Sequence, residues 1–186
     1  NALRQGVLGA IVLSAMLSGS GVFAGEIKGK VTATGLKSAE GIAVYVDTIP
    51  GKKFDPPAQN VLVDQRNMLF VPRTSVILKG TTVEFANSDD VGHSVYWTAI
   101  DNNKALRHSL TVISPEHKKP FKFDNTGTAQ LLCNMHKDMV GYMVVVPTPY
   151  FALTTRDGSF AIKDVPPGSY TLKTWSEDGK PTTQSV

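Results

Sequence analysis

Cysteine, histidine and tryptophan are scarce in this sequence, with one, four and two residues among 186. The single cysteine, Cys133, excludes a disulfide within the chain, and an odd cysteine in an oxidising compartment indicates pairing between chains or a special thiol. The formal net charge is only +3, which argues against nucleic acid as a partner. The sequence also lacks a phosphate loop, a dinucleotide fingerprint and a serine-hydrolase motif, which excludes those enzyme classes.

A sustained helical period is also missing after residue 25. Short alternating apolar runs are instead separated by Gly, Pro, Asn and Asp, a pattern typical of a β-sandwich. The apolar fraction of 41% is enough for ordinary cores. We therefore predict an all-β protein of one or two domains.

The N-terminal segment, residues 1–25, has one charged residue, Arg4, and is uncharged from residue 6 onward. Val22-Phe23-Ala24 fits a small-residue cleavage site, so this segment is predicted to be a secretory signal peptide. The alternative is an uncleaved transmembrane helix, because twenty residues at about 1.5 Å each just span a bilayer core. Four small residues at four-residue spacing would let such a helix pack against a partner helix in the membrane: Gly6, Ala10, Ser14 and Ser18.

Arg4 marks the cytoplasmic side of this segment. We therefore expect the folded part of the protein in the periplasm. It would be anchored to the inner membrane if the segment is retained, and secreted into the periplasm if it is cleaved.

The most informative stretch is residues 133–139, Cys-Asn-Met-His-Lys-Asp-Met. The alternation that precedes it places Ala129, Leu131 and Cys133 on the inner face of a strand, so the thiol should lie at its interior end. A thiolate, imidazoles and a weak axial thioether are the ligand set of a blue-copper electron-transfer site. His93, in the connection between the predicted strands 82–86 and 94–97, is the candidate for the missing imidazole.

Residues 59–146 resemble the cupredoxins, most closely the amicyanin and plastocyanin-like proteins. The matching parts are Gly-Thr-Thr-Val-Glu-Phe-Ala-Asn at 80–87, His93, Gly127 ahead of Cys133, the loop 133–139, and Gly-Tyr-Met-Val-Val-Val at 141–146. The resemblance implies a Greek-key β-sandwich that binds copper as Cu⁺ and Cu²⁺. It further implies His93, Cys133 and His136 as equatorial ligands with Met139 as the axial ligand.

The supporting residues depart from the family pattern in one place. Ser94 stands where relatives usually carry an asparagine that ties the two copper loops together, and its hydroxyl can supply the same bond. We expect Asn87 and Asn134 to support the ligands as well. Met135 and Met143 are rival thioethers, but Met143 falls in phase with the next strand and is expected to pack in the core.

The resemblance implies single-electron transfer between redox proteins, with His136 as the electron port at the surface. A multicopper oxidase would need a further histidine cluster, which the remaining His108 and His117 cannot build, so we expect a protein that is not an enzyme and has no small-molecule substrate. Two alternatives remain open. One is a membrane-anchored accessory subunit of a photosynthetic or respiratory complex, bound through the N-terminal helix and without metal, and the other is a copper carrier.

Two outer segments, residues 26–58 and 147–186, are predicted to form a second, discontinuous β-sandwich into which the cupredoxin is inserted. They resemble the carboxypeptidase regulatory-like, or transthyretin-like, modules through Asp157-Gly158 and through Pro-Pro-Gly-Ser-Tyr at 166–170. The Asp-Gly pair predicts a β-hairpin between residues 154–155 and 160–162. The alternative is that residues 26–58 supply the first strands of the cupredoxin itself.

Overall fold

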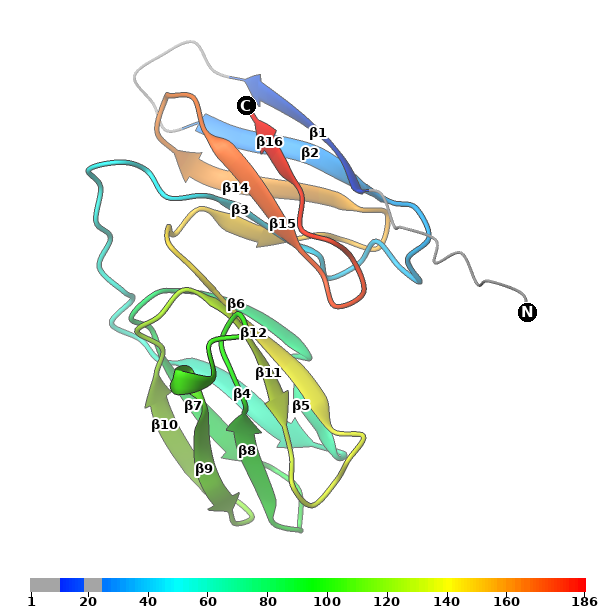
Figure 1. Cartoon of the computed structure of the whole chain (residues 1–186), viewed down its shortest axis with the longest axis vertical. Helices are drawn as coiled ribbons and strands as arrows, with labels where there is room; N and C mark the ends of the chain where they lie inside the picture. Colours follow the sequence, from blue (N-terminus) through cyan, green and yellow to red (C-terminus); the bar gives the residue numbers. More distant parts are fainter. Residues whose placement is uncertain (1–10, 19–24) are drawn as a thin grey trace. The chain divides into compact units, whose positions relative to one another are not determined.

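The computed structural model describes residues 11–18 and 25–186 (Figure 1). The described residues form β-strands and one short 3₁₀ helix, which confirms the predicted all-β class. The chain divides into two compact units, one of residues 53–149 and one of residues 1–52 together with 150–186. The predicted cupredoxin segment, residues 59–146, lies within the first unit.

The unit of residues 53–149 consists of two sheets, with strand orders β10-β7-β4-β5 and β6-β12-β11-β8-β9. Both sheets are mixed, because β4 runs parallel to β7 and β6 runs parallel to β12, whereas the other pairs are antiparallel. The elements are β4 Val61–Arg66, β5 Leu69–Val71, β6 Thr74–Leu78, β7 Thr82–Asn87, β8 His93–Trp97, η1 Lys104–Leu106, β9 His108–Ile113, β10 Lys118–Lys122, β11 Gly127–Leu132 and β12 Val140–Val146.

The core between these sheets comes from the period-two pattern of their strands. Along β7, Val83 and Phe85 are fully buried, while the residues that alternate with them, Thr82, Glu84 and Ala86, are partly exposed. Along β11, Ala129 and Leu131 are buried and Gln130 is exposed. Cys133 continues the same face one residue beyond the strand, so the thiol joins the core, as the alternation predicts.

Two connections of this unit carry the predicted ligands. The first joins β7 to β8 and ends at His93, and the second joins β11 to β12 and contains Cys133 and His136. The backbone N–H of Met139 donates to the carbonyl of His136 at 3.1 Å, which turns the chain back into β12. Because β11 and β12 are antiparallel neighbours and β8 pairs with β11 at Leu132, both connections lie at one end of the sandwich.

The other unit also has two sheets, β1-β2-β14 and β13-β3-β15-β16. Its core includes Ile27, Val44, Phe160 and Leu172. A turn is present at Asp157-Gly158, with Gly158 at φ +85°, but the predicted hairpin is wrong, because β13 before the turn pairs with β3 and β14 after it pairs with β2 in the other sheet. The strands are β1 Ile11–Ser18, β2 Gly25–Ala33, β3 Ala43–Val46, β13 Phe151–Leu153, β14 Ser159–Val165, β15 Thr171–Trp175 and β16 Thr183–Ser185.

The predicted N-terminal helix falls largely on residues 1–10 and 19–24, which lie outside the described residues. The part that the structure does describe, Ile11–Ser18, differs from the prediction because it is strand β1, paired antiparallel with β2. Gly6 and Ala10 of the small-residue stripe are outside the described residues, while Ser14 and Ser18 lie opposite Lys30 and Glu26 in this pair. Within residues 11–18 and 25–186, the structure has no helix of the length and apolar character needed to cross a membrane.

Candidate metal centre

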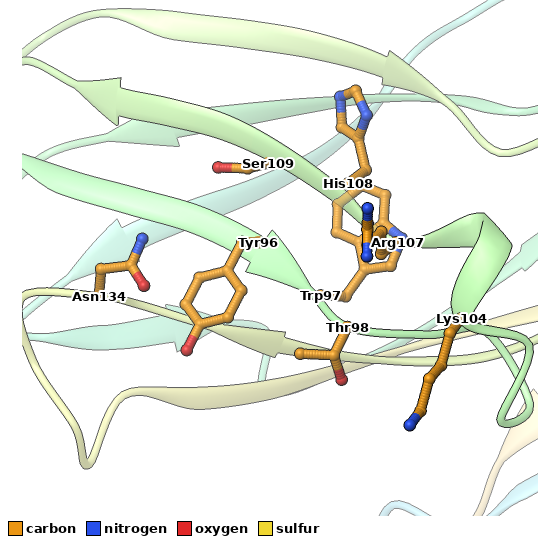
Figure 2. Close-up of a pocket in the computed structure, with 8 residues that line it drawn as sticks. All are labelled: Tyr96, Trp97, Thr98, Lys104, Arg107, His108, Ser109 and Asn134. Atoms are coloured by element: carbon orange, nitrogen blue, oxygen red, sulfur yellow. The ribbon is translucent and has the colours of Figure 1, made fainter.

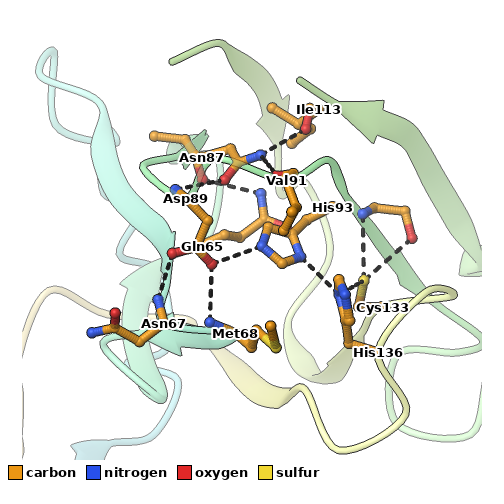
Figure 3. Close-up of polar contacts among 12 residues, drawn as sticks. Gln65, Asn67, Met68, Asn87, Asp89, Val91, His93, Ile113, Cys133 and His136 are labelled. Carbon is orange, nitrogen blue, oxygen red and sulfur yellow. Dashed lines mark hydrogen bonds and ion pairs between the residues drawn. The ribbon is translucent and has the colours of Figure 1, made fainter. Parts of the chain in front are cut away.

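His93, Cys133 and His136 meet at the end of the sandwich where the two connections lie (Figure 3). The Nδ1 atoms of His93 and His136 are 3.0 Å apart, and the Sγ atom of Cys133 is 3.8 Å from Nδ1 of His136. The three donor atoms all lie within 4.8 Å of one another. Sequence reasoning therefore selected three residues, from two distant loops, that the fold brings to one point.

Burial differs among the three side chains. His93 is fully buried, Cys133 is 4% exposed and His136 is half-buried. The strands explain the two buried positions: His93 is the first residue of β8, and Cys133 follows β11 on the face that points into the core. His136 is thus the one member of the group that solvent reaches appreciably.

Asp89 fixes the orientation of the His93 ring. Its Oδ2 atom lies 2.8 Å from Nε2 of His93. The backbone N–H groups of Asn67 and Met68 also donate to this carboxylate, at 2.6 and 2.9 Å. Burial raises the pKa of Asp89, but the hydrogen bonds from Met68, Asn67 and His93 outweigh it and hold the pKa below its usual range.

An ionised carboxylate can only accept, so Nε2 of His93 must carry the proton that the two atoms share. In this tautomer the lone pair is on Nδ1 of His93, which lies 3.0 Å from Nδ1 of His136. A carboxylate behind a histidine is a recurring way to fix the tautomer and to strengthen a metal ligand. Sequence reasoning missed Asp89, and the available signal was its position four residues before His93.

Asn87 shapes the connection that carries Asp89 and His93. Its Nδ2 atom donates to the carbonyls of Val91 and Ile113, at 2.8 and 2.9 Å, and its Oδ1 atom accepts from the backbone N–H of Asp89 at 3.0 Å. The side chain is 1% exposed, so these bonds replace water for a buried amide. Asn87 thus ties the loop to the neighbouring strand β9 and positions Asp89.

Ser94 joins the two ligand loops. Its backbone N–H lies 3.5 Å from Sγ of Cys133, its hydroxyl lies 3.8 Å from the same sulfur, and that hydroxyl accepts from the backbone N–H of Asn134 at 2.9 Å. The serine therefore makes the link that the sequence analysis assigned to its hydroxyl. Asn134 contributes through its backbone, whereas its side chain is exposed.

The surroundings of Cys133 favour the thiolate. Burial raises the pKa of the thiol, but hydrogen bonds from the backbone N–H groups of Ser94, Met135 and His136, and from the His136 ring, lower it more. The net result is a pKa of about 6, against 9.0 for the unperturbed group. The thiolate is the form that binds metals, so at neutral pH the site already holds its sulfur in the reactive form.

We expect the metal-free protein to show this ionisation directly. The ultraviolet absorbance of the thiolate should rise with a midpoint near pH 6, which leaves roughly 90% of the thiol ionised at pH 7. Because the lowered pKa belongs to the folded state, denaturant should move the midpoint up toward the ordinary range of a free thiol. The Cys133→Ser variant supplies the baseline, and a midpoint above about pH 8 in the folded protein would contradict the assignment.

The three methionines near the loop differ in burial. Met139 is 1% exposed and belongs to the core cluster that contains Cys133, whereas Met135 is 48% exposed. Met143 is fully buried and pairs with Ala129 in the middle of the β11–β12 ladder, in agreement with its predicted packing role. Met139, buried and on the ligand loop, remains the predicted axial ligand.

The other two histidines take no part in this group. The ring of His108 packs against Phe121 and Trp97, with centroid distances of 4.4 and 5.4 Å, and Nδ1 of His117 lies 2.8 Å from the carbonyl of Pro115. Among the described residues, His93, Cys133 and His136 are the one set of three such side chains arranged to share an ion.

The donor set fits copper. Two imidazole nitrogens and one thiolate suit a metal that is soft enough for sulfur and that also binds imidazole. Two donors that each lie about 2.0–2.3 Å from one ion can be at most about 4.0–4.6 Å apart, so the separations of 3.0 and 3.8 Å are compatible with ligands that share one ion.

Residues 58–146 match a family model described as copper binding proteins of the plastocyanin/azurin family. Curated proteins include no significant match to the chain. Among solved structures, a reduced mutant of amicyanin is similar, with 24% identity, 53% of this chain and 96% of that chain covered, and a TM-score of 0.44.

Two other solved structures are also similar to part of this chain. A purple cupredoxin from Nitrosopumilus maritimus has 19% identity, with 46% of this chain and 99% of that chain covered and a TM-score of 0.42. A copper-containing nitrite reductase from Thermus scotoductus has 22% identity, with 55% of this chain but only 25% of that chain covered and a TM-score of 0.45.

Proposed function

We propose that this protein, whose residues 58–146 match the family model of the plastocyanin/azurin copper binding proteins, transfers single electrons between redox proteins. In this proposal one copper ion is held by His93, Cys133 and His136, with Met139 as the axial ligand. Copper supplies the Cu⁺/Cu²⁺ couple when bound, and the side chains supply a site that accepts both oxidation states. The observation that carries the proposal is the convergence of the three donor atoms within 4.8 Å.

The protein's own residues keep the site rigid. Asp89 holds the His93 ring, Ser94 holds the sulfur of Cys133, and Asn87 holds the loop between β7 and β8. Residues fixed in this way need little movement when the charge of the site changes, which keeps the reorganisation cost of electron transfer low. A copper carrier would instead need ligands that exchange readily, and the burial of His93 and Cys133 favours the electron-transfer role over that alternative.

The half-buried His136 is the proposed surface port for the electron. Three exposed apolar side chains lie on the two ligand loops or on the neighbouring strand β9: Val91, Met135 and Val112 are 40%, 48% and 50% exposed. Gly92 allows the close approach of Val112, because a Cβ atom at residue 92 would lie 3.1 Å from Cγ1 of Val112, whereas Cε of Met135 would be at an ordinary contact distance of 3.7 Å. An apolar surface around the proposed electron port suits brief contact with a protein partner. We propose the periplasm as the location of this exchange.

The test is a visible absorption and electron-spin-resonance spectrum of the full-length protein after addition of Cu(II). We expect an intense blue thiolate-to-copper band and a narrow copper hyperfine splitting. A protein that stays colourless and binds no copper would contradict electron transfer and leave the metal-free accessory subunit as the better assignment.

Replacing Met139 with leucine should retain the blue band, because the three equatorial donors remain. Loss of a weak thioether donor destabilises Cu²⁺ more than Cu⁺, so the reduction potential should rise by something on the order of 50–100 mV, measured by voltammetry. The swap nearly conserves volume and should cost less than about 1.5 kcal/mol of stability. Met135→Leu is the matched control, and a larger shift in that variant would move the axial role to Met135.

A further inference from the structure

An ion that enters the metal centre should first meet His136, because this is the one donor side chain of the three that solvent reaches appreciably. His93 is fully buried and Cys133 is 4% exposed, whereas His136 is half-buried. The cavity of about 610 Å³ beside β8 and β9 (Figure 2) is poorly suited to receive a soft ion. No cysteine or methionine lines it, and the ring of its one histidine, His108, packs against Trp97. The surface around His136 is therefore the place to seek groups that help to load the site.

Two of the four methionines in residues 25–186 are exposed, and both belong to loops at the metal end of the sandwich. Met68 is 54% exposed and Met135 is 48% exposed, whereas Met139 and Met143 are buried. Methionine is among the residue types most often buried in folded proteins. Two thioethers in contact with solvent at this one end of the unit indicate a role other than packing in the core.

Met68 occupies a turn position that usually carries glycine. Asn67 and Met68 form the two-residue turn between β4 and β5, with φ values of +53° and +59°. Such a turn, with both φ values positive, most often has the sequence Asn-Gly. The backbone N–H of Met68 donates to the Asp89 carboxylate that holds His93, so this turn lies directly behind a ligand. Figure 3 shows the Met68 side chain directed toward the side of the group on which His136 lies.

Met135 reaches the same region from the other ligand loop. It immediately precedes His136, and its backbone N–H donates to the sulfur of Cys133. Its Cε atom is close to Gly92, the residue before His93, since a Cβ atom built at Gly92 would lie 3.7 Å from it. The side chain of Met135 thus extends from the cysteine loop to the histidine connection, across the junction of the two ligand segments.

The chemistry of a thioether distinguishes between the two oxidation states of copper. Thioether sulfur is a soft ligand that selects Cu⁺. A methionine side chain has three rotatable bonds, so its sulfur can follow an ion as the ion moves. In a transfer of Cu⁺ the bond to a thioether breaks as bonds to the imidazole of His136 and the thiolate of Cys133 form. One set of donors replaces another, and no electron is gained or lost.

We propose that Met68 and Met135 form an entry site for Cu⁺, which takes the ion from a soft donor in solution and passes it to His136 and Cys133. The inference rests on the proposed function, because it concerns how the same copper centre is loaded. The entry site acts on the rate of loading. The ligands of the loaded centre, and therefore its affinity and its blue band, do not depend on it.

The first test titrates the full-length Cys133→Ser variant with Ag⁺, which shares the softness of Cu⁺ and does not change its oxidation state under these conditions. The variant removes the thiolate that would otherwise compete for the ion. With the methionine methyl groups labelled with ¹³C, we expect the NMR signals of Met68 and Met135 to shift. Met143 is the internal reference, because it is buried in the β11–β12 ladder. Signals of Met68 and Met135 that stay in place would overturn the inference.

The second test follows transfer of Cu⁺ from its coloured bicinchoninate complex to the full-length protein by stopped-flow absorbance. Leucine nearly conserves the volume of methionine but lacks the sulfur. The double variant Met68→Leu/Met135→Leu should therefore take up Cu⁺ about tenfold more slowly, which corresponds to about 1.4 kcal/mol in the barrier. The final partition of Cu⁺ between chelator and protein should be unchanged. An unchanged rate of uptake would overturn the inference.

The matched control is uptake of Cu²⁺ by the same proteins, followed through growth of the blue band. Because a thioether favours Cu⁺, the double variant should slow this reaction less than about twofold. Equal slowing for both ions would overturn the inference in favour of a rim that admits any ion. Failure of the unmodified protein to bind copper would contradict the proposed function itself, whereas the Ag⁺ titration would still report on the two thioethers.

Discussion

Replacing Cys133 with serine is expected to abolish the blue band completely, because the band arises from the thiolate and no other cysteine exists in the chain. The hydroxyl does not ionise near neutral pH, so the site also loses the negative ligand that the neighbouring N–H groups stabilise. Copper affinity should fall steeply at pH 7. Visible absorption and a copper titration of the full-length variant measure both effects.

The fold should survive this substitution. Serine is close to cysteine in size and its oxygen can accept the bond that the Ser94 N–H now gives to sulfur. The exchange of a buried thiol for a hydroxyl should cost about 1–2 kcal/mol, as measured by urea denaturation of the metal-free proteins. The control is His108→Ala, which should keep the full blue band because His108 contacts Trp97 and Phe121 instead of the ligands. Bleaching by His108→Ala would contradict the ligand assignment.

Three of the four proposed ligands could be selected from the sequence because their signals are local. Cys133 continues an alternating strand, and His136 and Met139 follow it on one short loop, so strand periodicity and spacing suffice. His93 lies forty residues upstream of Cys133, so its place in the connection between two predicted strands makes it a candidate, and the resemblance to the cupredoxins then implies it as a ligand. Its placement beside His136 depends on the two loops meeting at one end of a sandwich, which is a property of the family fold.

Asp89 could not be assigned in the same way. Its role depends on the hairpin between β4 and β5, whose Asn67 and Met68 N–H groups hold the carboxylate against His93. A contact between a loop and a distant turn leaves no periodic trace in the sequence. Over Ile11–Ser18 the helix prediction is wrong for a different reason: an uncharged, mostly apolar run has no clear period to separate helix from strand, and these residues pair with β2.

Replacing Asp89 with asparagine is the second change from which we expect a large effect. The variant removes a negative charge that lies behind a copper ligand and that stabilises Cu²⁺ more than Cu⁺. With a contribution of about 1–2 kcal/mol at an effective dielectric constant of about 20, the reduction potential should rise by roughly 40–90 mV. Copper affinity should also fall, by about 10–100-fold, as is usual when the partner of a ligating histidine is changed.

Asp90 provides the matched control for charge. It is the next residue in the chain and is exposed, and among the described residues it makes no hydrogen bond or ion pair. Asp90→Asn removes the same charge at nearly the same place in the sequence but leaves the carboxylate on His93 intact. Because solvent screens an exposed charge, its shift in potential should be less than about a third of that of Asp89→Asn. Equal shifts in the two variants would mean that the reduction potential responds to any negative charge near the site and not to the carboxylate on His93.

A further measurement separates the role of Asp89 toward His93 from its role in the turn at Asn67 and Met68. All three partners donate to this carboxylate, so an asparagine offers one acceptor and must turn its NH₂ group toward a donor. If the carboxylate fixes the ring, the His93 Nε2–H proton should give a slowly exchanging NMR signal in the unmodified protein and in Asp90→Asn, and exchange rapidly in Asp89→Asn. A signal that persists in Asp89→Asn, together with an unchanged potential, would reduce Asp89 to a residue of the turn. Loss of the signal in Asp89→Asn, together with a higher potential, would instead establish that the Asp89 carboxylate fixes the tautomer and orientation of the His93 ring.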